Sequence, residues 1–245
     1  MIPIPLAVVI AISPALFAGA DSPRRAEITK PSSSPLDSRS ESGSASILAD
    51  LRSGRNAEAI SACLGIIERN PSDVSAYAWL FQALEETPAS ARAPAVLMAT
   101  QRIERLLREH PGNVYYHYGL GVAYQKQNKF ALAHEYLRKS ISLGGDFREV
   151  YGELVNCYLT KKDIEDTAAF LRARLKQSPD NAFLHQAIGL VHYYSSEYHD
   201  AYASLEKARA MFHEMGARGE EGRCLLNLSD VFTYLNDYPG AFREA

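Results

Sequence analysis

The sequence predicts an all-α protein built from stacked, antiparallel helix pairs. From Ser46 onward, apolar residues recur three and four positions apart, as they do on one face of a helix. Sets of large apolar and small residues then return at steps of 34 or 40 residues. No window shows the sustained alternation of a strand. Because one helix pair cannot cover its own apolar face, we expect neighbouring pairs to share a continuous core.

The first twenty residues form a separate segment. Residues 2–20 carry no charged side chain and end in Ala18-Gly19-Ala20, the small-x-small pattern that signal peptidase accepts. We therefore expect a signal peptide at 1–20 and export to the periplasm or out of the cell. Membrane anchoring by residues 2–20 stays open as an alternative, since no basic residue precedes the apolar stretch and Arg24 and Arg25 follow it.

Residues 21–45 form the next segment, which is rich in Ser and Pro and has almost no large apolar residue. Such a composition cannot bury enough surface to offset the entropy lost on ordering. The sequence therefore predicts a disordered linker at 21–45 and a helical array at 46–245.

The array is defined by internal repeats. One unit contains Tyr151, Leu154, Tyr158, Ala168, Leu171 and Pro179. Steps of 34 residues in either direction reach His117, Leu120, Gly121, Tyr124 and Ala133, and then His185, Ile188, Gly189, His192 and Ala201. Steps of 40 residues reach Tyr77 on one side and Leu225 on the other. We interpret each unit as two helices joined by a short polar turn.

This pattern resembles the tetratricopeptide repeat (TPR) family, whose period is 34 residues. The resemblance covers residues 46–245, and residues 120–143 are its most typical part. It implies a right-handed superhelical solenoid of antiparallel helix pairs. It also implies a scaffold that binds a protein or peptide.

Two parts of the array depart from the regular repeat. Residues 87–94 contain Pro88 and Pro94, which predicts a turn insertion between the two helices of one unit. Ala245 falls within the second helix of the sixth unit, so we expect the last repeat to be incomplete and the chain to be a fragment of a longer protein.

Composition and motifs argue against several functions. The formal net charge of -3 includes no basic excess for nucleic acid. The three cysteines are widely spaced and include no CxxC pair, so we interpret them as core residues and not as zinc ligands. His185, His192 and His199 recur every seven residues, too far apart along a helix to share one ion. No nucleophile motif is present, so we expect no enzyme, no metal and no cofactor.

The resemblance implies that the first helix of each pair lines a concave groove. Its aromatic content is typical of binding hot spots, where rings give large contact area at a low entropic cost. The candidate groove residues are Tyr115, Tyr118, Gln125, Lys126, Asn156, Phe183, Gln186, Tyr193 and Tyr194.

Two further roles stay open. The array could be the regulatory or sensing N-terminal region of a larger protein, such as a CHAT-type peptidase or a sensor kinase, whose catalytic domain lies outside this chain. It could also self-associate through its open C-terminal repeat. The identity of the partner and the oligomeric state are not predicted.

Overall fold

The computed structural model describes residues 37–157 and 161–237. The expected signal peptide, most of the expected linker and the end of the last repeat lie outside these residues. The chain divides into two compact units, 1–40 and 41–245, and helices α2 to α11 all lie in the second unit.

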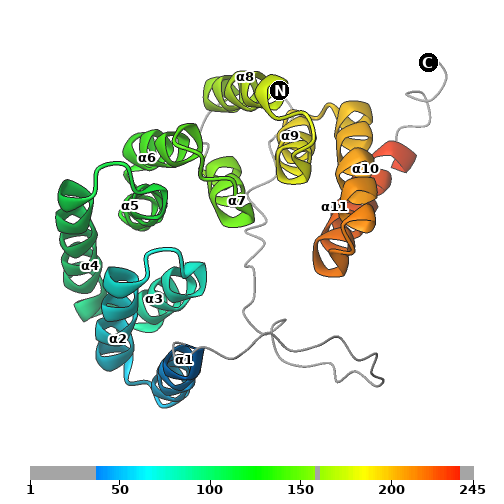
Figure 1. Ribbon diagram of the computed structural model, residues 1–245. Helices are drawn as coiled ribbons and strands as arrows, with labels where there is room; N and C mark the ends of the chain where they lie inside the picture. The colour runs from blue at the N-terminus through cyan, green and yellow to red at the C-terminus, as the bar shows by residue number, and fades with distance from the viewer. Residues whose placement is uncertain (1–36, 158–160, 238–245) are drawn as a thin grey trace, which may run out of the picture. The chain divides into compact units, whose positions relative to one another are not determined.

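The described residues form eleven α-helices and no strand, which confirms the predicted all-α class. The helices are α1 (Asp37–Arg52), α2 (Asn56–Arg69), α3 (Val74–Glu86), α4 (Ala89–Glu109), α5 (Val114–Lys126), α6 (Phe130–Ser142), α7 (Arg148–Asn156), α8 (Lys161–Gln177), α9 (Ala182–Tyr194), α10 (Tyr198–Glu214) and α11 (Arg218–Asp237). From α2 to α11, each helix contacts the next one along the chain, as in the hairpins α5/α6 and α9/α10 (Figure 1). None of the described helices is both long and apolar enough to cross a membrane.

The first helix begins earlier than the sequence predicts. Helix α1 starts at Asp37, within the segment that composition assigns to the linker. Its apolar anchors are Ile47 and Leu51, both buried. The helix extends from these anchors back through residues with no large apolar side chain, so composition alone does not mark its start.

The predicted turn insertion at 87–94 is wrong beyond Pro88. Thr87 ends α3, and its hydroxyl donates a hydrogen bond to the Ala83 carbonyl at 2.7 Å. Helix α4 then begins at Ala89 and contains Pro94. A proline in the second turn of a helix removes only one backbone hydrogen bond, here the one to the Ser90 carbonyl. Residues 89–94 are exposed, so water can donate a hydrogen bond to that carbonyl.

Helix starts are fixed by side-chain caps before three first helices. The carboxylate of Asp73 accepts from the backbone N–H of Ala76, and the side chains of Asn113 and Asn181 accept from the first turns of α5 and α9. Such caps satisfy backbone donors that have no partner inside the helix.

Close contact between paired helices depends on two glycines. A Cβ added at Gly121 would lie 2.5 Å from Leu137 Cγ, and one at Gly189 would lie 2.7 Å from Leu205 Cγ. Both distances are shorter than any relaxed carbon–carbon contact. Each glycine therefore lets the first helix of a pair reach the leucine of the second.

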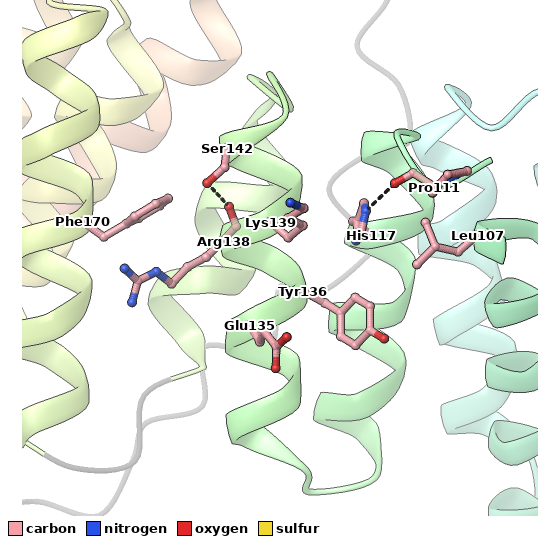
Figure 2. Close-up of a pocket in the computed structure, with 9 residues that line it drawn as sticks. All are labelled: Leu107, Pro111, His117, Glu135, Tyr136, Arg138, Lys139, Ser142 and Phe170. Atoms are coloured by element: carbon pink, nitrogen blue, oxygen red, sulfur yellow. Dashed lines mark hydrogen bonds between the residues drawn. The ribbon is translucent and has the colours of Figure 1, made fainter.

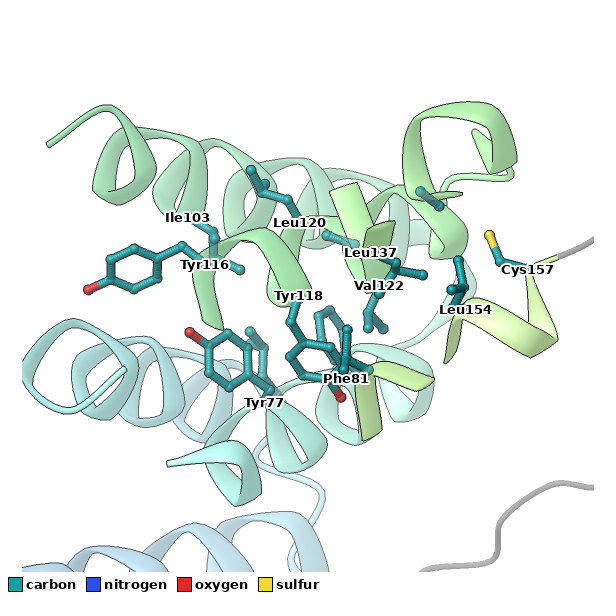
Figure 3. Close-up of a cluster of buried hydrophobic side chains, with 14 of the residues drawn as sticks. Tyr77, Phe81, Ile103, Tyr116, Tyr118, Leu120, Val122, Leu137, Leu154 and Cys157 are labelled. Atoms are coloured by element: carbon teal, nitrogen blue, oxygen red, sulfur yellow. The ribbon is translucent and has the colours of Figure 1, made fainter. Parts of the chain in front are cut away.

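The predicted continuity of the core fails beyond α9, where buried residues form two separate clusters, one around Leu205 and Leu228 and the other around Ala208 and Phe212. From α1 to α9 the core is continuous, as predicted. At its centre, the rings of Tyr77 and Tyr118 meet edge to face, with their centres 5.6 Å apart (Figure 3). All three cysteines are buried, which confirms their prediction as core residues. Burial raises the pKa of the Cys157 thiol to about 11, so this thiol stays protonated at neutral pH.

Candidate binding surface

Eight of the nine candidate groove residues fall into four pairs at equivalent positions of α5 and α9. The two members of each pair lie 68 residues apart, which is two repeat periods. The pairs are Tyr115 with Phe183, Tyr118 with Gln186, Gln125 with Tyr193, and Lys126 with Tyr194. Asn156, the ninth, is exposed and is the last residue of α7.

The second pair belongs to the core, which corrects the sequence prediction. Tyr118 is 4% exposed and Gln186 is 8% exposed. The Tyr118 ring packs against Tyr77 on one side and Phe147 on the other, at 5.6 and 5.3 Å between ring centres. Because both members of the pair are buried, the position itself is a packing position and offers no free surface.

The first pair is half-buried against neighbouring rings. Tyr115 stacks on Phe147, with ring centres 5.2 Å apart. Phe183 packs against Phe212 of α10 at 5.1 Å. These two rings keep part of their surface exposed, but one face of each is already occupied.

The end of α5 carries polar side chains that bridge to neighbouring first helices. Lys126 forms an ion pair with Glu85 of α3. The side chain of Gln125 lies near Glu153 of α7 and acts to lower the pKa of that carboxyl group. Desolvation raises the pKa of Glu153 even though Lys126 opposes the rise. We call Glu85, Gln125, Lys126 and Glu153 the polar patch.

The equivalent end of α9 carries aromatic side chains. Tyr193 contacts Tyr194, Tyr198 and Tyr234 edge to face, at 5.4, 6.0 and 5.7 Å between ring centres. Tyr198 and Tyr234 stack at 5.0 Å with their planes 6° apart. We call these four residues the tyrosine cluster. Tyr234 is 37% exposed and the other three are half-buried.

A hollow of about 250 Å³ adjoins the tyrosine cluster. It is lined by Ser196, Glu197, Tyr198, His199, Asp200, Tyr234 and Leu235. The hollow therefore combines two stacked rings with two carboxylates. The donor atoms of Glu197 and Asp200 also lie within 4.8 Å of a donor atom of His192, so these three side chains could hold a metal ion.

Four residues of this surface are not among those that the sequence predicts: Tyr198, Tyr234, Glu197 and Asp200. A signal for Tyr234 was present, since it lies 40 residues after Tyr194 and the same step relates His185 to Leu225. The other three follow a turn and lie outside the first helices that the TPR resemblance marks as groove-lining.

A larger hollow of about 520 Å³ lies elsewhere, over α4, α5, α6 and α8. Its lining residues are Leu107, Pro111, His117, Glu135, Tyr136, Arg138, Lys139, Ser142 and Phe170 (Figure 2). The Arg138 guanidinium lies 4.5 Å from the centre of the Phe170 ring, a cation–π contact. This hollow contains none of the candidate groove residues.

Two buried histidines have structural partners. The Nε2–H of His117 donates to the Pro111 carbonyl at 3.0 Å, and that of His185 donates to the Pro179 carbonyl at 2.9 Å. Burial lowers the pKa of both imidazoles. Each neutral ring therefore holds the loop before its own helix in place through this hydrogen bond, at Pro111 before α5 and at Pro179 before α9.

No protein-family model matches the sequence, and a search of curated proteins found no match. Solved structures similar to this chain include the one named MamA MSR-1 C2, with 20% identity, a TM-score of 0.38, and coverage of 72% of this chain and 98% of that one. Another is TTC0263, described as a thermophilic TPR protein in Thermus thermophilus, with 16% identity, a TM-score of 0.44 and coverage of 76% and 98%. MamA from Desulfovibrio magneticus RS-1 is 14% identical with a TM-score of 0.37, and the match covers 63% of this chain and 90% of that one. The fold assignment rests on the helices and contacts of this chain.

Proposed function

We propose that this array is a scaffold that binds a segment of another polypeptide at the tyrosine cluster. The observation that carries the proposal is the grouping of four tyrosine rings, all partly exposed, beside a hollow at the ends of α9 and α11. Tyrosine is enriched in binding hot spots because its ring gives a large contact area and its hydroxyl can form a hydrogen bond.

The size of the hollow favours a polypeptide over a small molecule. Pockets that enclose a drug-sized ligand have volumes of roughly 300–1,000 Å³. The hollow beside Tyr198 and Tyr234 has about 250 Å³, enough to hold one side chain. A bound segment would place one side chain there and lay its backbone across the neighbouring rings.

A binding role also agrees with the state of the reactive side chains. The Cys63, Cys157 and Cys224 thiols are buried and their pKa values are raised, which disfavours the nucleophilic thiolate. His117 and His185 each bond a proline carbonyl. These groups stabilise the fold through burial and hydrogen bonds. Export directed by residues 1–20 is part of the proposal, and the partner would then be met outside the cytoplasm.

The proposal is tested by selecting peptides that bind the wild-type protein and measuring their affinity for variants. Tyr193→Ala and Tyr194→Ala should each weaken binding about tenfold, as expected for hot-spot residues. The matched controls are Gln125→Ala and Lys126→Ala, at the equivalent positions of α5. These should leave affinity within about twofold, as neutral contacts do. If all four variants lose affinity equally, or if none loses affinity, the tyrosine cluster is rejected as the binding surface.

A further inference from the structure

Three metal-ligating side chains meet where α9 turns into α10. His192 lies in the last turn of α9, Glu197 immediately precedes α10, and Asp200 lies in its first turn. The turn between them is tight because Ser196 adopts a positive φ of 62°. As a result, one donor atom from each of the three side chains lies within 4.8 Å of the other two.

The group is ordered and also reachable from solvent. The Nδ1–H of His192 donates to Oε2 of Glu197 at 2.5 Å, and His192 is only 9% exposed. The Glu197 side chain is 49% exposed, and both carboxylates line the hollow beside the tyrosine cluster. An ion entering through this hollow would meet two carboxylates, one of which is hydrogen-bonded to the buried imidazole of His192.

The fold does not need these residue types at this turn. The equivalent turn between α5 and α6 has Tyr124, Lys129 and Leu132 at the same three positions. Its geometry is the same, since Asn128 has a φ of 57° and the Lys129 N–H donates to the Tyr124 carbonyl at 2.9 Å. The Glu197 N–H donates to the His192 carbonyl at the same distance. Turn formation alone therefore does not account for the His, Glu and Asp set.

We propose that His192, Glu197 and Asp200 bind a divalent transition-metal ion of the zinc class. One imidazole and two carboxylates suit this class, and three protein ligands leave a position for water. With bond lengths of about 2.0–2.2 Å, tetrahedral ligand atoms lie roughly 3.4 Å apart. The three donor atoms now lie within 4.8 Å of one another, so movements of less than about 1.5 Å bring them to the tetrahedral spacing. The ion would then take the place of the proton between Nδ1 of His192 and Oε2 of Glu197. This inference does not depend on polypeptide binding.

Bound there, the ion would tie the end of α9 to the start of α10. Tyr193 follows the first ligand and Tyr198 follows the second, so the ion would also hold two members of the tyrosine cluster in place. Metal binding would then stabilise the hairpin α9/α10 and leave α5/α6 unchanged.

Calorimetric titration of the metal-free protein, without a histidine tag, with zinc chloride tests the proposal. We expect saturable binding with one ion per chain, and cobalt(II) at the same site should show an absorption spectrum typical of nitrogen and oxygen ligands. His192→Gln and Asp200→Asn should each weaken zinc binding at least about tenfold. Asp200 is exposed, so its variant should fold even if His192→Gln does not.

The matched control is His213→Gln. His213 also meets a carboxylate, that of Glu221, at 3.0 Å, but no third ligand joins this pair within the described residues. Zinc binding should survive this substitution, and it should also survive Tyr193→Ala, which separates the metal site from the peptide surface. Absence of saturable binding, or equal affinity in the wild type and the Asp200→Asn variant, would overturn the proposal.

Discussion

The hairpins α5/α6 and α9/α10 share one set of packing residues, which we call the frame. Comparing the two hairpins shows which positions packing fixes and which positions can vary. They share the cap asparagine, the histidine bond to a proline carbonyl, the close-contact glycine, the small alanine of the second helix, and the leucine that meets the glycine. The shared pairs are Asn113 and Asn181, His117 and His185, Gly121 and Gly189, Ala133 and Ala201, and Leu137 and Leu205.

The two hairpins differ at the far ends of their first helices. In α5 this end carries Gln125 and Lys126, which form the polar patch with α3 and α7. In α9 the equivalent residues are Tyr193 and Tyr194 of the tyrosine cluster. Across the following turn, the Lys129 ammonium lies 5.6 Å from the centre of the Tyr124 ring, whereas the imidazole at position 192 hydrogen-bonds a carboxylate. The frame tolerates either chemistry, so binding properties can be confined to one hairpin.

The largest expected effect tests whether the frames are equivalent. Gly121→Ala and Gly189→Ala should each destabilise the protein by about 1–3 kcal/mol, because the new methyl group overlaps a leucine of the paired helix. Urea unfolding followed by helical circular dichroism measures both losses. If one hairpin accepts alanine without loss, the two helix pairs do not pack in the same way.

Gly152→Ala is the control for these substitutions. Gly152 lies within α7, and a Cβ there would meet nothing within 4 Å. Alanine should therefore stabilise the helix by about 0.5–1 kcal/mol, since it restricts the unfolded chain. A loss of stability in the Gly152→Ala variant as well would mean that overlap with a leucine does not explain the losses at Gly121 and Gly189.

The packing residues shared by the two hairpins were predictable from the sequence because each packing contact repeats at a fixed interval. Gly121 and Gly189 were recognisable from their spacing, and the structure shows the leucine that each one admits. The start of α4 was not predictable in the same way. A proline within a helix normally signals a break, and only the exposure of residues 89–94 makes Pro94 tolerable.

The candidate surface was less predictable because it depends on contacts between units. Tyr118 and Tyr115 lie on nearby faces of one helix, and the sequence does not reveal that Phe147, just before α7, packs against both. The grouping of His192 with Glu197 crosses a turn whose positive φ falls on Ser196, a residue with no preference for that conformation. A helical projection of the sequence does not place His192 beside Glu197, because the contact forms only when the turn after α9 reverses the chain.

A second test gives α6 the side chain that α10 has at one position where the two hairpins differ. Tyr136 of α6 stacks on Tyr124 at 5.4 Å and lies 5.8 Å from the His117 ring, whereas α10 has Ser204 at the equivalent position. Tyr136→Ser should cost about 1–2 kcal/mol through lost ring contacts and burial. Leu132→Ser, on the same helix but 40% exposed, should change the unfolding free energy by less than about 0.5 kcal/mol. Similar losses in the two variants would mean that the stacked rings contribute little.

A smaller effect is expected at Ser140, which is fully buried and donates a hydrogen bond to the Val114 carbonyl at 2.8 Å. Its equivalent in α10 is Ala208, so the frame does not require the hydroxyl. Ser140→Ala should cost about 1 kcal/mol, the net value of one hydrogen bond. Ser142→Ala, which removes an exposed hydroxyl bonded within its own helix, should be close to neutral in the same urea assay. A neutral Ser140→Ala would show that α5/α6 relaxes to the arrangement of α9/α10.

The smallest effect concerns pH and the two proline-bonded histidines. Desolvation is the main cause that lowers the pKa of His117 and of His185 below the ordinary value of 6.5. Above about pH 7.5 both rings are neutral in the folded and unfolded chains and contribute no pH dependence. As the pH falls through 6.5, the unfolded chain binds protons that the folded chain does not, so the free energy of unfolding decreases until the folded pKa is reached.

Urea midpoints of the wild type between pH 7.5 and 5.5 should therefore fall, and His117→Gln or His185→Gln should each remove part of the slope. Burial also lowers the pKa of His134, so some slope should remain when both are replaced. Equal reductions from the two single variants would show that the histidines act alike in both hairpins. A slope that only one of them reduces would mean that nearby charges, Lys139 beside His117 or Lys207 and Asp180 beside His185, make the difference between otherwise equivalent sites.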